Sequence, residues 1–460
     1  MSARVVVVGG GITGLSAAHA LASARPDLRL TLLERRERLG GNIVTERTDG
    51  FVLDGGPDSF LRVKREGVEL CKELGLESEL VTTREESRRV YFVHDGALEP
   101  MPAGMALAVP TRIRPMIETK LLSLSGKLRM LGDLVLPKSR NEDDESIESF
   151  LGRRFGREAA KKLAAPLLGG IYAGDIGELS VRATFPQLVE LEQRHGSLVR
   201  AFVKAQPRTA RNGHPPSPFV SLRSGMGGLI DALASRLPAG TVRTGVVVSR
   251  ISRREDGRWD VAVDGEILDA DAVIVASPAH VAARVVADEP LARELAAIPY
   301  LSTATVFFGW PRAAVEHPLD GVGFVAPKGE SALIAATWVT SKWDARAPEG
   351  HVLVRAFLGG VRSVVDIAKS SDDDLVAIAK PELERLMGRL GTAELVRVFR
   401  YVDANPQPVV GHPARMQRIR RRLAELPGLE LAGAAYEGVG IPDCIRQGRA
   451  AADRILAERC

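Results

Sequence analysis

The chain has 460 residues, of which 45% are hydrophobic and 26% are charged, and its formal net charge is +4. This length exceeds one ordinary domain, and the composition is that of a globular protein with enough apolar residues for a large core. A small net charge without a dense basic tail or arm gives no reason to expect a nucleic acid as partner. We therefore expect two or three globular domains.

The cysteines and the start of the chain indicate a compartment. Cys71, Cys444 and Cys460 are too few and too scattered for a disulfide framework or a zinc site, which is typical of a reducing environment. Met1–Arg4 leads directly into the first predicted strand, and no apolar run approaches the roughly 18 residues of a membrane-spanning helix. We expect a cytoplasmic protein, whose membrane contact, if any, is peripheral and on the inner face.

The first forty residues carry the clearest motif. Val5–Val8 predicts a strand that runs into GxGxxG, with Gly9, Gly11 and Gly14 in the glycine positions, and then into a helix. In this motif the glycines permit the turn, the approach of a pyrophosphate and the close packing of helix and strand. Glu34 follows a second predicted strand about 20 residues further on, where an acid can bind ribose hydroxyls. The unit predicts a dinucleotide site.

The residues after Glu34 favour FAD over NAD. They read ExxxRxGG, with Arg38, Gly40 and Gly41 in the motif positions, which matches the extension of two-dinucleotide-binding-domain flavoproteins. Paired glycines let the backbone pass beside a second stretch of a long cofactor. The glycine- and proline-rich turn at 55–60 is expected either to lie against the cofactor's flat ring or to be a surface turn.

The middle of the chain predicts a helical insert. Apolar residues recur at mainly helical spacing over 100–137, interleaved with lysine and arginine, and further helices are expected over 147–155 and 158–168. The apolar positions are expected either to form an ordinary core or to make a basic-rimmed surface for a bulky ligand or a membrane. The polar, proline-rich segment 207–218 predicts a linker.

The second half of the chain is expected to return to the nucleotide sheet. The last strand, turn and helix would close the cofactor site, with Asp443 as the N-cap of that helix, and a long helix near 372–390 would be broken at Pro381. The expected fold class is α/β, with a discontinuous FAD-binding Rossmann-type domain over 1–90, 219–298 and 401–460, a helical insert domain over 91–206, a linker over 207–218 and a mixed α+β substrate-binding domain over 299–400. Part of 60–90 is also compatible with the substrate domain.

Several strings are more specific than the glycine motif. They are Ile171–Asp175, Leu179–Ser180, Thr184–Gln187, Gly411–His412 and Tyr436–Cys444. With them the chain, over nearly its whole length, resembles the oxygen-dependent porphyrinogen oxidases of haem biosynthesis, which are amine-oxidase-like FAD enzymes. No HExxH or CxxC motif, and no serine with a plausible base, occurs in the sequence, so neither metal nor covalent catalysis is expected.

The resemblance implies an activity and a set of site residues. The enzyme would remove six electrons from a porphyrinogen in two-electron steps, with noncovalent FAD as hydride acceptor and O2 as the oxidant that yields H2O2. No catalytic acid or base is implied, because pyrrole protons can leave through tautomerism and water. Gly169 and Gly170 match the backbone beside the reacting carbon, with Gly170 in contact with substrate. The FAD-contacting positions would be Gly9, Gly10, Gly11, Ile12, Thr13, Gly14, Glu34, Arg35, Gly40, Gly41, Asn42, Gly56, Pro57, Asp58, Ser59, Val248, Gly433, Val439, Gly440 and Ile441.

The sequence leaves alternatives open both for the substrate and for the class of protein. By the resemblance, Lys64 and Arg89 match cations that meet substrate propionates in different branches of the family. Coproporphyrinogen III carries four propionates and protoporphyrinogen IX two, so more cations favour the former. The rivals from other classes are an amine oxidase, a carotenoid desaturase and a non-enzymatic FAD-fold binding protein. A basic cluster is expected to be a solvated face or, as the alternatives, a substrate clamp or a docking surface for the next enzyme of haem synthesis; it contains Arg415, Arg418, Arg420, Arg421 and Arg422.

Overall fold

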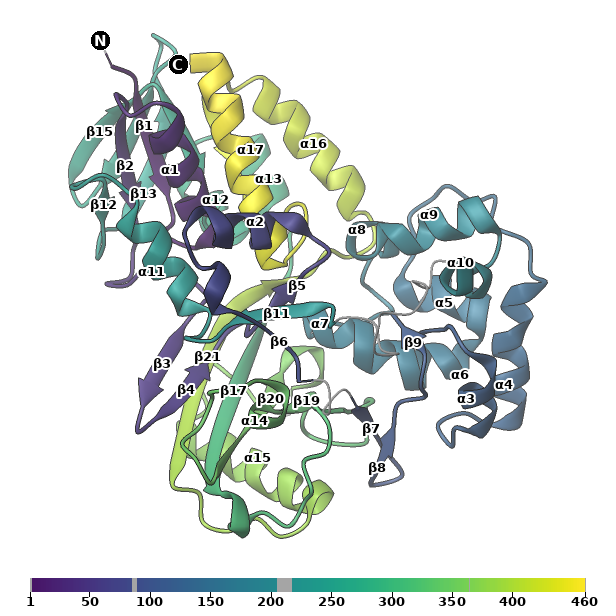
Figure 1. Cartoon of the computed structure of the whole chain (residues 1–460). Coiled ribbons are helices and arrows are strands. Elements are labelled where there is room, and N and C mark those ends of the chain that lie inside the picture. Colours follow the sequence, from purple (N-terminus) through teal and green to yellow (C-terminus); the bar gives the residue numbers. More distant parts are fainter. Residues whose placement is uncertain (1, 85–88, 205–216, 364, 460) are drawn as a thin grey trace.

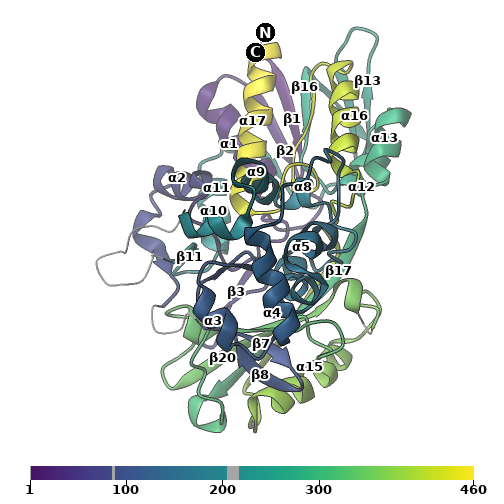
Figure 2. The same ribbon diagram turned by 90° about the vertical axis from the view of Figure 1, so that its right-hand side faces the viewer.

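The computed structural model describes residues 2–84, 89–204, 217–363 and 365–459. A parallel sheet flanked by helices, a seven-stranded sheet below it and a group of helices to one side make up the molecule (Figure 1). The first strand and the last helix belong to the same unit, and both views place the two ends of the chain together (Figure 2). The predicted α/β fold class is confirmed.

The parallel sheet is built from segments that are far apart in the sequence. Its strands lie in the order β12-β2-β1-β16-β22, and each neighbouring pair is parallel. Their bounds are Arg4–Val8 for β1, Arg29–Leu33 for β2, Val242–Arg243 for β12, Ala272–Val275 for β16 and Leu429–Leu431 for β22. The nucleotide-binding unit is therefore discontinuous, as predicted.

The valine run of β1 divides its side chains between the two faces of this sheet. Val5 and Val7 pack in one core with helices α1, α11 and α17, whose bounds are Ile12–Ala24, Gly227–Ser235 and Ile441–Arg459. Val6 and Val8 pack in the core of the other face, with β14, α12, α13 and α16. Side chains alternate along a strand, so a central parallel strand covered on both faces needs an unbroken apolar run. The second face is covered by β13 (Val248–Arg253), β14 (Trp259–Val263), β15 (Glu266–Ala270), α12 (Ala279–Val285), α13 (Glu289–Ala296) and α16 (His412–Ala424).

The seven-stranded sheet is the second main sheet of the molecule, and in Figure 1 it lies below the parallel sheet. Its order is β21-β17-β20-β19-β18-β7-β8, and it is antiparallel except between β18 and β7. The bounds are Val90–His94 for β7, Ala97–Pro100 for β8, Tyr300–Pro311 for β17, Gly323–Val325 for β18, Ala335–Trp338 for β19, His351–Gly359 for β20 and Leu395–Pro406 for β21. Helix α15 (Asp372–Met387) packs in the core of this sheet.

The structure also contains shorter strands and helices. A hairpin pairs β3 with β4, and a small sheet has the order β5-β11-β6. The bounds are Thr45–Thr48 for β3, Phe51–Asp54 for β4, Phe60–Leu61 for β5, Leu80–Thr82 for β6 and Phe219–Leu222 for β11. The short helices α2 (Arg65–Glu73) and α14 (Val339–Lys342) follow β5 and β19 in the chain.

Three strands depart from the approximate domain boundaries predicted from the sequence, and one helix prediction is wrong. β7 and β8 join the seven-stranded sheet, although the helical insert was expected to begin at residue 91, and β21 continues to Pro406, past the expected end of the substrate domain at 400. Their partner strands are distant in the sequence, so a local pattern cannot reveal them. Helix α15 runs through Pro381 without a break, because buried side chains on both sides of the proline, including Leu375 and Leu383, hold it on the sheet.

The helical unit has a core of its own. Its elements are a hairpin of β9 (Met105–Ala106) and β10 (Val109–Pro110), α3 (Ile113–Glu118), α4 (Leu124–Leu131), α5 (Ile147–Phe155), α6 (Arg157–Ala159), a π-helix (Ala160–Gly169), α7 (Gly170–Tyr172), α8 (Val181–Thr184), α9 (Pro186–His195) and α10 (Leu198–Lys204). Of the apolar residues in the predicted pattern, Val109, Met116, Leu121 and Leu122 are buried, whereas Ile117, Leu124 and Leu128 are exposed. The pattern therefore contributes both to a core and to the surface.

Two sequence expectations near this unit have different outcomes. The helix predicted to end before the Gly169–Gly170 pair instead continues through it to Tyr172. The predicted linker 207–218 lies almost wholly outside the described residues. Among the helices that the structure describes, none is long and apolar enough to cross a lipid bilayer.

Candidate active site

An elongated cavity of about 580 Å³ runs from the glycine-rich turn after β1 to the start of α17. It is bounded by the carboxyl ends of parallel strands, where α/β sheets bind their ligands. Fourteen of the predicted cofactor residues line it: Gly9, Gly11, Ile12, Thr13, Glu34, Arg35, Gly40, Gly41, Asn42, Pro57, Val248, Gly433, Val439 and Ile441. The two ends of the chain therefore form one site.

The glycine-rich turn fits a pyrophosphate. Gly9 has φ +112, a conformation that favours glycine, and a Cβ on Gly14 would lie 1.9 Å from the Gly9 carbonyl oxygen. A Cβ on Gly11 would meet only the Gly41 Cα, at 3.9 Å, so the cavity side of Gly11 is open. Helix α1 has no capping side chain and no acid in its first turn. Its first N–H groups are therefore available to a bound anion.

Glu34 and Arg38 organise the loop that follows β2. The Glu34 carboxylate accepts hydrogen bonds from the backbone N–H groups of Gly10 at 2.7 Å and Arg36 at 2.8 Å. A carboxylate has acceptor capacity beyond two bonds, so it can still accept ribose hydroxyls. The Arg38 guanidinium donates to the carbonyl of Gly41 at 2.9 Å. The arginine of ExxxRxGG thus shapes the backbone of the loop.

The remaining predicted cofactor positions do not line this cavity. Two of them, Gly56 and Asp58, line a second cavity, which is described below. The other four line neither cavity: Gly10, Gly14, Ser59 and Gly440. Gly440 has a steric role, because a Cβ there would lie 2.9 Å from Asp443 Oδ2. Asp443 itself lies in the first turn of α17, not before it, so its prediction as the N-cap is wrong. Its carboxylate is instead paired with Lys64.

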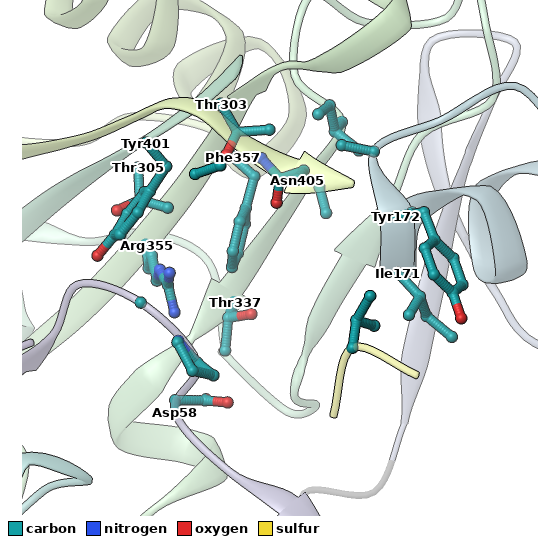
Figure 3. A pocket seen from close by; sticks show the side chains of 18 of the residues that line it. Asp58, Ile171, Tyr172, Thr303, Thr305, Thr337, Arg355, Phe357, Tyr401 and Asn405 are labelled. Carbon is teal, nitrogen blue, oxygen red and sulfur yellow. Dashed lines mark hydrogen bonds between the residues drawn. The ribbon is translucent and has the colours of Figure 1, made fainter. Parts of the chain in front are cut away.

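A second cavity of about 490 Å³ adjoins the first. Six residues line both: Asn42, Pro57, Ala404, Pro406, Ala434 and Val439. Figure 3 shows side chains from β17, β20 and β21, among them Thr305, Phe357 and Tyr401, on one side of it, and Ile171 and Tyr172 on the other. The second cavity therefore lies between the seven-stranded sheet and the helical unit, and it opens onto the region that it shares with the first cavity.

The two glycines at the end of the π-helix have different surroundings. Gly170 lines the second cavity, and a Cβ there would meet no atom within 4 Å. A Cβ on Gly169 would lie 2.9 Å from the Gly174 carbonyl oxygen, and Gly169 does not line the cavity. Gly170 thus leaves space for a ligand, whereas Gly169 allows the chain to pack. π-Helical turns are frequent at functional sites.

Asp58 and Tyr401, which line the second cavity, keep their charge states near neutral pH. Burial alone would raise the pKa of Asp58, but Lys342 and Arg355 outweigh it and hold that pKa well below its usual range. The Asp58 carboxylate accepts hydrogen bonds from Lys342 Nζ at 2.8 Å and Trp343 Nε1 at 2.9 Å. Burial raises the pKa of Tyr401 to about 12. No histidine is among the described residues that line this cavity.

The cations singled out in the sequence are paired with protein carboxylates. Lys64 Nζ lies 2.5 Å from Asp443 Oδ2, and Arg89 Nη1 lies 2.9 Å from Asp320 Oδ2; neither cation lines either cavity. In the basic cluster of α16, Arg415 and Arg418 pair with Glu294, Arg420 with Glu437 and Arg422 with Asp288. These pairs hold α16 on its neighbours, so the cluster is largely structural.

Sequence reasoning missed most of the second cavity. Arg355, Lys342 and Tyr401 line it, and none was singled out. One signal was available: Arg355 is the only charged residue within the otherwise apolar run from Val352 to Leu358. A lone cation in a buried strand is costly unless it has a function or a partner.

The fold and the first cavity are those of a Rossmann-type dinucleotide-binding protein, and a second cavity adjoins the first. Residues 12–456 match the family described as flavin containing amine oxidoreductase. The chain is 39% identical to the coproporphyrinogen III oxidase of Bacillus subtilis in an alignment of 465 positions that covers 98% of each chain. It is 33% identical to the protoporphyrinogen oxidase of Macaca fascicularis in an alignment of 494 positions that covers 99% of each chain. A crystal structure of a putative protoporphyrinogen oxidase from Exiguobacterium, 35% identical, superposes with a TM-score of 0.89 and covers 100% of this chain and 99% of its own.

The chain therefore belongs to the family of flavin-containing amine oxidoreductases. The first cavity, with its glycine turn and helix start, has the residues that a flavin dinucleotide needs.

Proposed function

We propose that the protein oxidises coproporphyrinogen III to coproporphyrin III with FAD and O2. Each of three two-electron steps removes a hydride and a proton from the macrocycle, and each of three O2 molecules is reduced to H2O2. The observation that carries the proposal is the second cavity, which adjoins the dinucleotide cavity and is left open at Gly170. A flat, bulky substrate can meet the cofactor there.

The residues of the cavity position the substrate rather than take its protons. Bound flavin supplies hydride acceptance and reaction with O2. Gly170 leaves room for the ring to approach, and Phe357 and Tyr172 give apolar walls. Because Lys342 and Arg355 hold the pKa of Asp58 well below its usual range, its carboxylate is a weak base, and among the described residues of the wall none is poised to act as a general base near neutral pH. Pyrrole protons therefore leave to water, and orientation is the protein's main contribution.

Coproporphyrinogen III is favoured over protoporphyrinogen IX for two reasons. The relative from Bacillus subtilis, at 39% identity, is named a coproporphyrinogen III oxidase, and the protoporphyrinogen oxidase from Macaca fascicularis is 33% identical. The wall of the second cavity also carries two cations, Lys342 and Arg355, against one carboxylate, Asp58. A substrate with more carboxylates suits an excess of positive charge.

FAD is proposed to bind without a covalent bond. Cys444 lines the dinucleotide cavity, but burial raises the pKa of its thiol to about 11. A thiol in that state is a poor nucleophile. Acid precipitation should release all of the yellow cofactor into the supernatant, and Cys444→Ser should retain it in the native protein. Colour that stays with the precipitated wild-type chain would contradict noncovalent binding.

Aerobic turnover on both porphyrinogens tests the proposed function. The purified yellow protein should convert each colourless porphyrinogen to a fluorescent porphyrin, with the higher kcat/KM for coproporphyrinogen III. A higher kcat/KM for protoporphyrinogen IX would overturn the choice of substrate alone. A protein that binds FAD but turns over neither would instead support a non-enzymatic binding role.

A further inference from the structure

Arg355 is a buried cation without a protein counter-ion. It lies in the middle of β20, is only 5% exposed, and lines the second cavity. No carboxylate of the described residues lies within 4.0 Å of its guanidinium, and its Nε has no hydrogen-bond partner. The guanidinium carbon lies 4.4 Å from the centroid of the Phe357 ring, and Nη2 donates to the carbonyl of Gly55. These contacts leave the charge itself unbalanced.

The other arginines that have a buried, unpartnered nitrogen differ from Arg355 in one respect. These are Arg258, Arg346 and Arg415, and each has a carboxylate within 4.0 Å, from Asp269, Asp54 and Glu294 respectively. Arg346 is the best match, because it is 1% exposed and its Nη2, like that of Arg355, donates to a backbone carbonyl, that of Leu222. A buried charge without a partner is strongly unfavourable. The exception at Arg355 therefore points to an anion that comes from outside the chain.

The carboxylate that acts most strongly on the charge of Arg355 is that of Asp58, and it already has hydrogen-bond partners of its own. Asp58 interacts with Arg355 at longer range, but its oxygens accept from Lys342 and Trp343. Because Lys342 neutralises Asp58, the wall keeps one excess positive charge. It fits one further carboxylate.

A second unpartnered polar group lies beside Arg355. The hydroxyl of Tyr401 is buried and has no hydrogen-bond partner, and Tyr401 and Arg355 interact electrostatically. Figure 3 shows the two side chains on one side of the cavity, with Ile171 and Tyr172 on the other. A guanidinium N–H and a phenolic O–H can both donate to one carboxylate.

We propose that Arg355, together with the hydroxyl of Tyr401, binds one carboxylate of the porphyrinogen. The inference rests on the proposed function and adds the residue that sets how the macrocycle is turned in the cavity. Arginine suits this task because its planar guanidinium remains charged when buried and donates in a fixed geometry. Anchoring one propionate at this end would direct the opposite side of the ring towards Gly170.

The test compares a carboxylate ligand with its neutral ester. Coproporphyrin III and its tetramethyl ester, neither of which can be oxidised further, are titrated into the FAD-loaded protein, and their Kd values are read from porphyrin fluorescence. Arg355→Met should raise the Kd for coproporphyrin III about 10- to 100-fold and leave the Kd for the ester within about twofold of the wild-type value. Arg355→Lys should recover part of the affinity, and it keeps the test available if Arg355→Met does not fold. Tyr401→Phe should give a smaller loss, again for the acid only.

Stability and flavin affinity separate this role from others. Arg355→Met should keep or raise Tm, because it removes an unbalanced buried charge, whereas the matched Arg346→Met should lower Tm and leave porphyrin binding unchanged. If Arg355→Met loses equal affinity for the acid and the ester, or loses none, the inference is overturned. Turnover of the porphyrinogen by the wild-type protein would still support the proposed function. A loss of FAD affinity instead would mean that the anion belongs to the cofactor. A wild-type protein that neither binds nor oxidises any porphyrinogen would overturn both.

Discussion

Lys64 Nζ lies 2.5 Å from Asp443 Oδ2, and this ion pair joins the residue before α2 to the first turn of α17. The two residues are 379 positions apart in the chain. Asp443 is 12% exposed at its side chain, and its neighbour Cys444 lines the dinucleotide cavity. The lysine that the resemblance assigned to a substrate propionate thus already neutralises an acid beside the cofactor.

Lys64→Met should therefore affect the flavin more than the substrate. An uncompensated Asp443 would add negative charge near the cavity and disfavour the reduced, more anionic flavin, lowering the midpoint potential by about 10 to 20 mV. The Kd for coproporphyrin III should stay within about threefold of wild type. Redox titration and porphyrin titration of the same variant measure both.

The control for this variant is Arg89→Met, which breaks the exposed pair with Asp320 and should change neither quantity. The opposite pattern, a loss of more than about tenfold in porphyrin affinity at an unchanged potential, would return Lys64 to the role of a substrate ligand.

Gly170 and Gly169 provide a matched pair of substitutions. Gly170 has φ −58, so Ala fits its backbone and should leave stability unchanged or raise it by up to about 1 kcal/mol. Its methyl group would enter the cavity, so kcat/KM should fall at least about tenfold. Gly169→Ala should instead lower stability by about 1 to 3 kcal/mol, because of the 2.9 Å approach to Gly174. Urea unfolding and turnover measure the two effects, and a fully active Gly170→Ala would contradict the substrate's position.

Asp58 should stabilise the fold in a way that depends on pH. Its pKa is held below the ordinary value, so its contribution is complete above the pKa of the unfolded chain and is lost as pH falls through the folded pKa. Asp58→Asn should cost about 2 kcal/mol at neutral pH, since Lys342 loses its partner. The difference from wild type should be constant above about pH 5 and shrink below about pH 4. Urea unfolding across this range checks it, and a difference that grows on acidification would show that the sign is wrong.

The pH dependence of catalysis should be flat around neutrality. Among the described groups that line the second cavity, the pKa of Asp58 lies well below 7 and that of Tyr401 is about 12. The value of kcat/KM should vary less than about twofold between about pH 6 and 9. A bell-shaped profile with a pKa near 7 would require a base that the cavity wall does not provide.

The parts of the structure that could be predicted are those fixed by neighbouring residues. Gly9 needs its positive φ and Gly14 its close packing whatever the rest of the chain does, so the motif and the cofactor site followed from a few positions. The alternation of Val5–Val8 between two cores has the same local origin. These features depend on covalent geometry and on side-chain periodicity.

The parts that could not be predicted depend on distant partners. β7 pairs with β18, more than 200 residues away. The carboxylate of Asp443, which was expected to cap the last helix, instead forms an ion pair with Lys64. Arg355 was hidden in an apolar run, because its significance comes from what surrounds it: the engaged Asp58 and the unpartnered Tyr401. Such relationships arise only when the chain is folded.

Anaerobic mixing of the purified protein with coproporphyrinogen III tests the central claim most directly. The visible absorption of the bound flavin should bleach before air is admitted, because the flavin takes the first two electrons from the porphyrinogen. On admission of air the absorption should return and porphyrin fluorescence should appear, with three O2 consumed per porphyrin formed. A flavin that stays oxidised in the presence of the porphyrinogen, while an artificial reductant can still bleach it, would contradict the account.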